Sequence, residues 1–151
     1  MKLVNDFLGE IEYTQDDVVF FKEGLFGFDD LKEYVYIVNP DPAFPFGWLQ
    51  STKNNETSFV VTNPFLFVSE YDFELPDPVI EKLEINEIDD VTILTLVVIP
   101  DDPQNTTINL KSPVVLNKST RQAKQVILDE EYELKYKIFK KDGAEKDVDS
   151  L

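Results

Sequence analysis

Residues 132–138 read Tyr-Glu-Leu-Lys-Tyr-Lys-Ile, an alternation of apolar and charged side chains. Successive side chains of a β-strand point to opposite faces, so this alternation predicts a strand with one buried face and one solvated face. Leu134 and Tyr136 fall on the predicted buried face. The stretch is the clearest indication that the fold is built from strands.

Shorter runs rich in β-branched and aromatic residues occupy much of the preceding chain. They cover residues 18–21, 34–38, 59–62, 92–99, 107–110, 114–116 and 125–128. Turn signals rich in Asn, Asp and Pro separate them, for example at residues 39–42 and 100–103. Many short strands at close spacing predict an all-β domain, either a small barrel or a sandwich. The expected core residues are Ile93, Leu96, Val98, Ile108, Leu110, Val126, Leu134 and Tyr136.

Helical signals are few, so at most one or two short helices are expected. Residues 78–83 favour a short helix with Asp77 as its N-cap and Pro78 at its first position. Residues 119–123 are predicted to form one helical turn. Residues 1–140 have the length of one domain, and the polar residues 141–151 are predicted to form a flexible tail.

The composition excludes several kinds of chemistry. The 151 residues include 30 Asp and Glu against 14 Lys and Arg, a formal net charge of −16, and no Cys or His. A chain without Cys and His has no thiol nucleophile, disulfide, Ser-His-Asp triad or ordinary transition-metal site. Its acidity argues against binding nucleic acid or an anionic membrane through bulk charge. No signal peptide and no apolar run of about 20 residues is visible, so we expect a cytoplasmic, non-enzymatic protein without cofactors.

The acidic residues are concentrated early in the chain. Residues 1–110 hold 5 Lys and 22 acids, a net charge of −17. Four Asp-Asp pairs begin at Asp16, Asp29, Asp89 and Asp101. Such neighbours point to opposite faces of a strand and suit turns, so the structural interpretation is favoured. A carboxylate-dependent hydrolase and a calcium-dependent β binding module remain as alternatives.

Two hydrophobic clusters stand out, residues 24–28 and the run from Phe44 through Phe46 and Trp48 to Leu49. Core packing is one interpretation of both clusters, and an exposed aromatic anchor for a protein partner is the other. The second cluster has more apolar area than a turn requires. A third segment, residues 65–73, lies around Phe67 and Tyr71, where a strand is expected, and its mixture of aromatic and acidic residues suits a basic partner with an apolar anchor.

Several elements, in order along the chain, resemble the FliW family of flagellar assembly factors. They are Glu-Gly-Leu-Phe-Gly-Phe at 23–28, Pro-Phe with Trp-Leu-Gln-Ser at 45–51, Glu-Tyr-Asp at 70–72, Asn-Leu-Lys-Ser-Pro-Val-Val-Leu-Asn at 109–117, and Gln-Val-Ile-Leu with a following Tyr at 125–132. The match at 70–72 is partial, because Glu70 stands where the family has Asp. The resemblance implies a compact β-barrel-like protein without enzymatic activity.

The resemblance also implies two protein partners. Members of the family bind flagellin, and they bind the RNA-binding translational regulator CsrA, relieving its repression of flagellin translation. Phe44, Phe46, Trp48, Phe67 and Tyr71 are the candidate apolar contacts for flagellin. The candidate contacts for the basic surface of CsrA are Glu70, Asp72, Asp101 and Asp102.

Two mechanisms against CsrA stay open at the level of the sequence. An acidic protein could occupy the RNA groove of CsrA, or it could bind elsewhere and change that groove. The resemblance favours the second.

Overall fold

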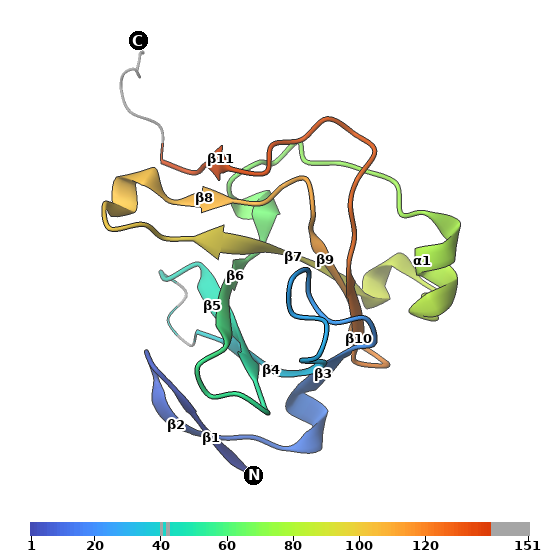
Figure 1. The fold of residues 1–151 in the computed structure, drawn as a ribbon. Helices are drawn as coiled ribbons and strands as arrows, with labels where there is room; N and C mark the ends of the chain where they lie inside the picture. Colours follow the sequence, from blue (N-terminus) through green and yellow to red (C-terminus); the bar gives the residue numbers. More distant parts are fainter. Residues whose placement is uncertain (40, 42, 140–151) are drawn as a thin grey trace.

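A closed ring of seven strands forms the body of the molecule (Figure 1). The computed structural model describes residues 1–39, 41 and 43–139. The ring strands are β3 (Val18–Phe21), β4 (Glu33–Val38), β5 (Phe46–Ser51), β6 (Ser58–Thr62), β7 (Val91–Val98), β9 (Val114–Asn117) and β10 (Gln122–Gln125). Their order is β7-β6-β5-β4-β3-β10-β9, and β9 pairs back onto β7. The predicted all-β, barrel-like fold is confirmed.

β7 has two partners along one of its edges. Residues 91–94 pair with β9, whereas Val97 and Val98 pair with β8 (Thr107–Ile108). β8 pairs in turn with β11 (Tyr136–Lys137), so these two short strands extend the sheet beyond the ring. Every pair in this sheet is antiparallel except β3 with β10, which is parallel.

The strand predicted over residues 132–138 is mostly wrong, because only the two residues of β11 pair. Upstream of β11 the Glu133 carbonyl accepts a hydrogen bond from the N–H of Leu110 at 3.0 Å, so the chain follows the loop after β8 instead of a strand. Leu134 is 61% exposed rather than buried. The alternation of apolar and charged residues did not reveal that the neighbouring strand, β8, is too short to pair with the whole segment.

The predicted core residues divide by burial into three groups. The structure buries Ile108, Leu110 and Val126, half-buries Ile93, Leu96 and Tyr136, and exposes Val98 and Leu134. Val98 is the last residue of β7, and the face to which it points is uncovered there.

A separate hairpin covers the outside of the ring. β1 (Lys2–Asn5) and β2 (Gly9–Glu12) pack Leu3 against Val18 of β3 and Val35 of β4. β4 therefore has covered side chains on both faces, which explains its nearly continuous apolar sequence. Neither the hairpin nor β5 was predicted, because the hairpin is short and polar and because Gly47 and the prolines before β5 suggested a loop.

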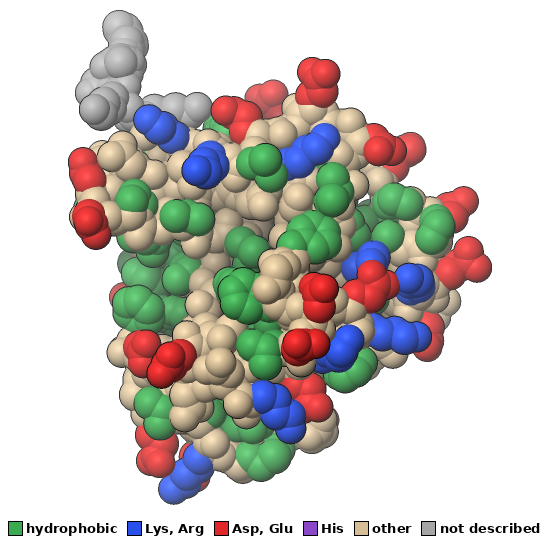
Figure 2. All heavy atoms as spheres, in the orientation of Figure 1, with side chains coloured by type: hydrophobic (Ala, Val, Ile, Leu, Met, Phe, Trp, Pro, Cys, Tyr) green, Lys and Arg blue, Asp and Glu red, His purple; other side chains and the backbone are tan. Residues whose placement is uncertain are grey.

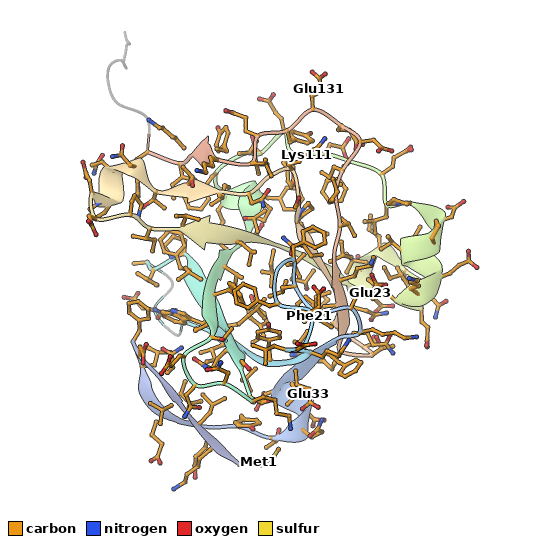
Figure 3. All side chains as sticks on the ribbon, viewed as in Figure 1. Met1, Phe21, Glu23, Glu33, Lys111 and Glu131 are labelled. Carbon is orange, nitrogen blue, oxygen red and sulfur yellow. The ribbon has the colours of Figure 1, made fainter. Side chains whose placement is uncertain are left out.

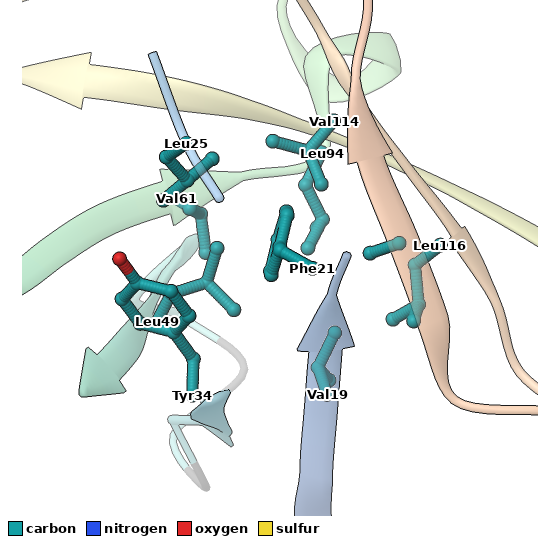
Figure 4. Close-up of a cluster of buried hydrophobic side chains, with 10 residues drawn as sticks. Val19, Phe21, Leu25, Tyr34, Leu49, Val61, Leu94, Val114 and Leu116 are labelled. Atoms are coloured by element: carbon teal, nitrogen blue, oxygen red, sulfur yellow. The ribbon is translucent and has the colours of Figure 1, made fainter. Parts of the chain in front are cut away.

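The interior of the ring is filled by one apolar cluster (Figure 4). It includes Phe21 and Tyr34, whose rings meet edge-on with centroids 5.4 Å apart. Leu25, from the loop between β3 and β4, is also buried in this cluster, so that loop closes the ring from inside. Gly24 makes the turn possible with φ +72°, and an added Cβ would lie 2.6 Å from the Phe28 carbonyl oxygen.

The single α-helix in the described part of the chain is α1 (Asp77–Lys82). Its N-cap is Pro76 rather than the predicted Asp77, because the Pro76 carbonyl accepts from the N–H of Val79 and Ile80. Short 3-10 turns occur at η1 (Gln15–Asp17), η2 (Pro64–Leu66), η3 (Ile88–Asp90) and η4 (Pro103–Asn105). None of the helices among the described residues has the length and apolar character that crossing a bilayer requires.

Two predictions near the C-terminal end are corrected. Residues 119–123 form no helical turn, because the chain reverses there between β9 and β10, with Arg121 at φ 64°. The strand predicted over residues 125–128 lies earlier, as β10, where Ala123 pairs with Leu116. Alternating polar residues hid this strand in the sequence. The predicted tail, residues 141–151, lies outside the described residues.

Candidate partner-binding surfaces

Aromatic side chains form a continuous strip along the outer face of β5. Phe7, at the tip of the β1–β2 hairpin, lies over Trp48 with ring centroids 6.0 Å apart, and Phe44 lies over the same indole at 6.0 Å. Phe44 continues to Phe46 at 5.3 Å, and Phe46 to Phe67 at 6.3 Å. These five residues are named the aromatic strip.

Exposure separates accessible rings from supporting rings within the aromatic strip. Phe7 is 72% exposed and Phe44 is 41% exposed, whereas Trp48 is only 4% exposed. Phe46 and Phe67 are half-buried. Trp48, predicted as a partner contact, therefore supports the exposed rings above it, and its indole N–H has no hydrogen-bond acceptor among the described residues.

Phe7 was missed by the sequence analysis, although a hydrogen-bonded turn presents it. The buried Asn5 side chain accepts from the backbone N–H groups of Phe7 and Leu8 at 2.9 and 3.0 Å. Its amide nitrogen donates to Gln50 Oε1 at 3.2 Å, which ties the hairpin to β5. Asn5 followed by Gly9 was the available turn signal.

A second apolar surface lies between the segment at residues 65–75 and the first half of β7. A cavity of about 260 Å³ is lined by Phe65, Tyr71, Asp72, Phe73, Leu75, Ile88, Val91 and Ile93. The set is named the acid-rimmed pocket, because acidic residues border it. No strand forms around Phe67 and Tyr71, where one was predicted; η2 and irregular chain occupy this stretch.

Tyr71 belongs to the pocket's floor rather than to its exposed edge. The side chain is buried, its hydroxyl donates to the Leu110 carbonyl at 2.5 Å, and its ring meets Tyr132 edge-on at 4.7 Å. Burial raises the pKa of Tyr71, and the neighbouring Tyr132 and Glu130 add to this effect. The phenol therefore remains a hydrogen-bond donor that fixes the loop, and Tyr71 is not an exposed anchor.

The four predicted acidic contacts do not form one site. Glu70 and Asp72 are exposed near the acid-rimmed pocket, and Asp72 lines it. Asp101 and Asp102 are exposed on the β7–β8 loop, where Asp102 accepts from the backbone N–H of Gln104 at 3.1 Å and caps η4. Figure 2 shows acidic side chains spread over the viewed face, with apolar groups between them.

The carboxylates show no metal-binding grouping in residues 1–39, 41 and 43–139. No group of three or more acidic side chains is placed to hold a metal ion within those ranges. The pairs at Asp16, Asp89 and Asp101 lie in or beside η1, η3 and η4. Their position in turns supports the structural interpretation of these pairs.

Glu23 connects three elements on the surface (Figure 3). Its carboxylate accepts from Lys124 of β10 at 2.6 Å and from Lys82 of α1 at 2.8 Å. These hydrogen bonds, chiefly the one from Lys124, lower the pKa of Glu23 from 4.5 to about 2. The ion pairs link α1 and β10 to Glu23, which lies two residues after the end of β3.

Comparison with known proteins agrees with the geometry. A family model described as FliW protein matches residues 2–138. The chain belongs to the FliW family. The flagellar assembly factor FliW of Alkaliphilus metalliredigens is 42% identical over 139 residues, covering 91% of this chain and 86% of that protein.

Another FliW sequence and a solved FliW structure extend the comparison. The flagellar assembly factor FliW of Caldicellulosiruptor saccharolyticus is 43% identical over 132 residues, covering 87% of this chain and 86% of that protein. A crystal structure of the flagellar assembly factor FliW superposes with a TM-score of 0.87 at 32% identity, covering 94% of this chain and 99% of that one.

Several of the FliW-like residues have structural roles here. Gly24 permits a turn that no side chain fits. Gln125 accepts from the N–H of Phe26 at 3.0 Å and donates to the Ser112 carbonyl at 3.2 Å, so it connects the loop between β3 and β4 to β10. These positions maintain the scaffold, and the exposed rings and acids remain as the candidate contacts.

Proposed function

We propose that this protein is a cytoplasmic, non-enzymatic flagellar assembly factor that binds flagellin and antagonises CsrA. The observation that carries the proposal is that a FliW-family barrel presents two exposed apolar surfaces, the aromatic strip and the acid-rimmed pocket. The names of the relatives support the flagellar role. Binding assays of the purified protein with purified flagellin and with purified CsrA test the proposal. Failure to bind either of the two partners contradicts it.

The aromatic strip is the proposed surface for flagellin. Exposed aromatic rings over a buried support provide apolar area with few rotatable bonds, which suits the apolar termini of unassembled flagellin. Removing the Phe44 ring is expected to cost about 1–3 kcal/mol of flagellin binding. Phe28 is a matched control, because it is equally exposed but packs on Phe59, outside the strip.

The acidic residues are the proposed source of attraction to CsrA. Glu70, Asp72, Asp101 and Asp102 are all exposed, and single exposed ion pairs contribute only about 0–1 kcal/mol. Their summed field should raise the association rate, and salt should lower it. Association rates measured from low to high salt test this, and a rate independent of salt would mean that the acids serve solubility.

The mode of antagonism is proposed to be allosteric. In that case RNA and this protein bind CsrA together, and each weakens the other to a finite limit. Titration of a CsrA–RNA complex distinguishes the two mechanisms. An RNA affinity that falls without limit as this protein is added would show that it occupies the RNA groove instead.

A further inference from the structure

The acid-rimmed pocket combines an apolar hollow with an unusually exposed aliphatic side chain. Phe65, Phe73 and Leu75 line one part of the hollow, and Ile93 of β7 lines another. Ile88, from η3, stands at its edge with 87% of its surface exposed. Together they make one continuous apolar patch, a kind of surface that marks contact sites.

The two chain segments that form the pocket carry charges of a single sign. Residues 65–75 and 85–91, which border it, contain no Lys or Arg. Their acidic members are Glu70, Asp72, Glu74, Glu87, Asp89 and Asp90. All of these are exposed except Asp90, which is half-buried and accepts from the Ser119 hydroxyl at 3.1 Å. The rim therefore attracts cations on an approaching partner.

The size and lining of the pocket fit a side chain better than a small molecule. Its volume of about 260 Å³ lies below the roughly 300–1,000 Å³ typical of small-molecule sites. Asp72 is the one charged residue among its lining residues. The lining offers apolar burial with little polar recognition, as expected for an anchor residue of a protein partner.

We infer that the acid-rimmed pocket receives one large apolar side chain from a partner segment that also carries Lys or Arg within a few residues. The inference rests on the proposed function, because CsrA is the basic partner expected there. The acids attract the segment and raise the association rate, whereas burial of the apolar side chain slows dissociation. In this arrangement flagellin binds at the aromatic strip and CsrA binds at the acid-rimmed pocket.

Three single variants of the full chain test the inference. Ile88→Asn removes the exposed apolar edge without adding charge, and Asp72→Asn removes the charge that lines the pocket. Val4→Asn is the control, because Val4 is exposed on the N-terminal hairpin, which contributes nothing to the pocket. Melting temperatures confirm that each variant is folded.

Distinct kinetic effects on CsrA binding are expected. Ile88→Asn should weaken CsrA affinity at least tenfold, mainly through faster dissociation. Asp72→Asn should lower the association rate and its salt dependence, and Val4→Asn should change neither. If Ile88→Asn binds CsrA within twofold of the parent protein, or loses flagellin binding instead, the pocket assignment is wrong while the proposed function stands.

A peptide probe keeps the pocket testable if the parent protein fails to bind CsrA, which would contradict the proposed function. The probe is Lys-Lys-Leu-Leu-Lys-Lys, with Lys-Lys-Ser-Ser-Lys-Lys as its control, read by isoleucine-methyl NMR. Shifts of the Ile88 and Ile93 methyl signals with the leucine peptide alone support the pocket. Equal shifts with both peptides, or no shifts, overturn it.

Discussion

Asn117 is the buried side chain that joins the end of α1 to the turn between β9 and β10. Its amide nitrogen donates to the carbonyls of Leu83 and Glu84 at 2.7 and 3.2 Å. Its amide oxygen accepts from the backbone N–H groups of Ser119 and Thr120 at 2.9 and 3.3 Å. Asn117→Ala removes all four interactions and leaves their backbone partners without them.

The expected loss of stability follows from that geometry. A hydrogen bond contributes about 0.5–1.5 kcal/mol net, and a buried group left without a partner costs about 1–3 kcal/mol. The Leu83 bond is fully buried and the other three are partly buried, so Asn117→Ala should cost about 2–4 kcal/mol. For a domain of this length that corresponds to a melting temperature lower by roughly 5–15 °C.

Thermal and urea unfolding followed by circular dichroism measure this loss. Asn54→Ala is the matched control, because the exposed Asn54 side chain accepts a single hydrogen bond, from the N–H of Glu56 at 2.9 Å. It should cost less than about 1 kcal/mol. Equal losses for Asn54→Ala and Asn117→Ala would refute the assignment of Asn117 as the joint between α1 and the turn.

Four further predictions follow from single features. Gly24→Ala should destabilise more than Gly9→Ala, because both positions have positive φ but only Gly24 lacks room for a Cβ; equal melting temperatures would contradict this. Phe7→Ala should shift the emission of Trp48, the single tryptophan, to longer wavelength with little loss of stability, and unchanged emission would show that Phe7 does not cover it. The depressed pKa of Glu23 stabilises the fold above about pH 4.5, and this contribution, of about 0–1 kcal/mol, is lost as pH falls toward 2; the stability difference from Glu23→Gln should therefore shrink over that range. EDTA should leave the melting temperature unchanged, and a drop would reveal a metal site formed by oxygen ligands.

Strands were predictable where apolar residues face a core on at least one side. The predicted run at residues 18–21 coincides with β3, and those at 34–38, 59–62 and 92–99 match β4, β6 and β7 to within a residue or two. β5 was read as an aromatic loop, because Gly47 and the prolines before it suggested turns. In the structure an added Cβ at Gly47 would lie 2.5 Å from the Ile37 carbonyl oxygen, so glycine marks close approach of β4 there.

The candidate contacts were only partly predictable for a related reason. Phe44 and Trp48 are close in the sequence, yet one is exposed and the other is buried beneath it and Phe7. Residue type cannot distinguish these outcomes, because large aromatic side chains are common both in cores and at interfaces. The position of Phe7 depends on the packing of the β1–β2 hairpin against the outside of the barrel. This contact joins segments that are about 40 residues apart in the sequence.

The sequence by itself determined the class of fold, the absence of His and Cys chemistry, the strong acidity and the resemblance to the FliW family. These properties depend on composition, on the order of short motifs and on local periodicity. The tertiary structure alone decided the closure of the ring through β7 and β9, the burial of Trp48 and Tyr71, and the assembly of the acid-rimmed pocket from residues 65–75 and 85–93. Strand pairing and burial depend on which distant segments meet, and no local pattern in the sequence specifies that partner.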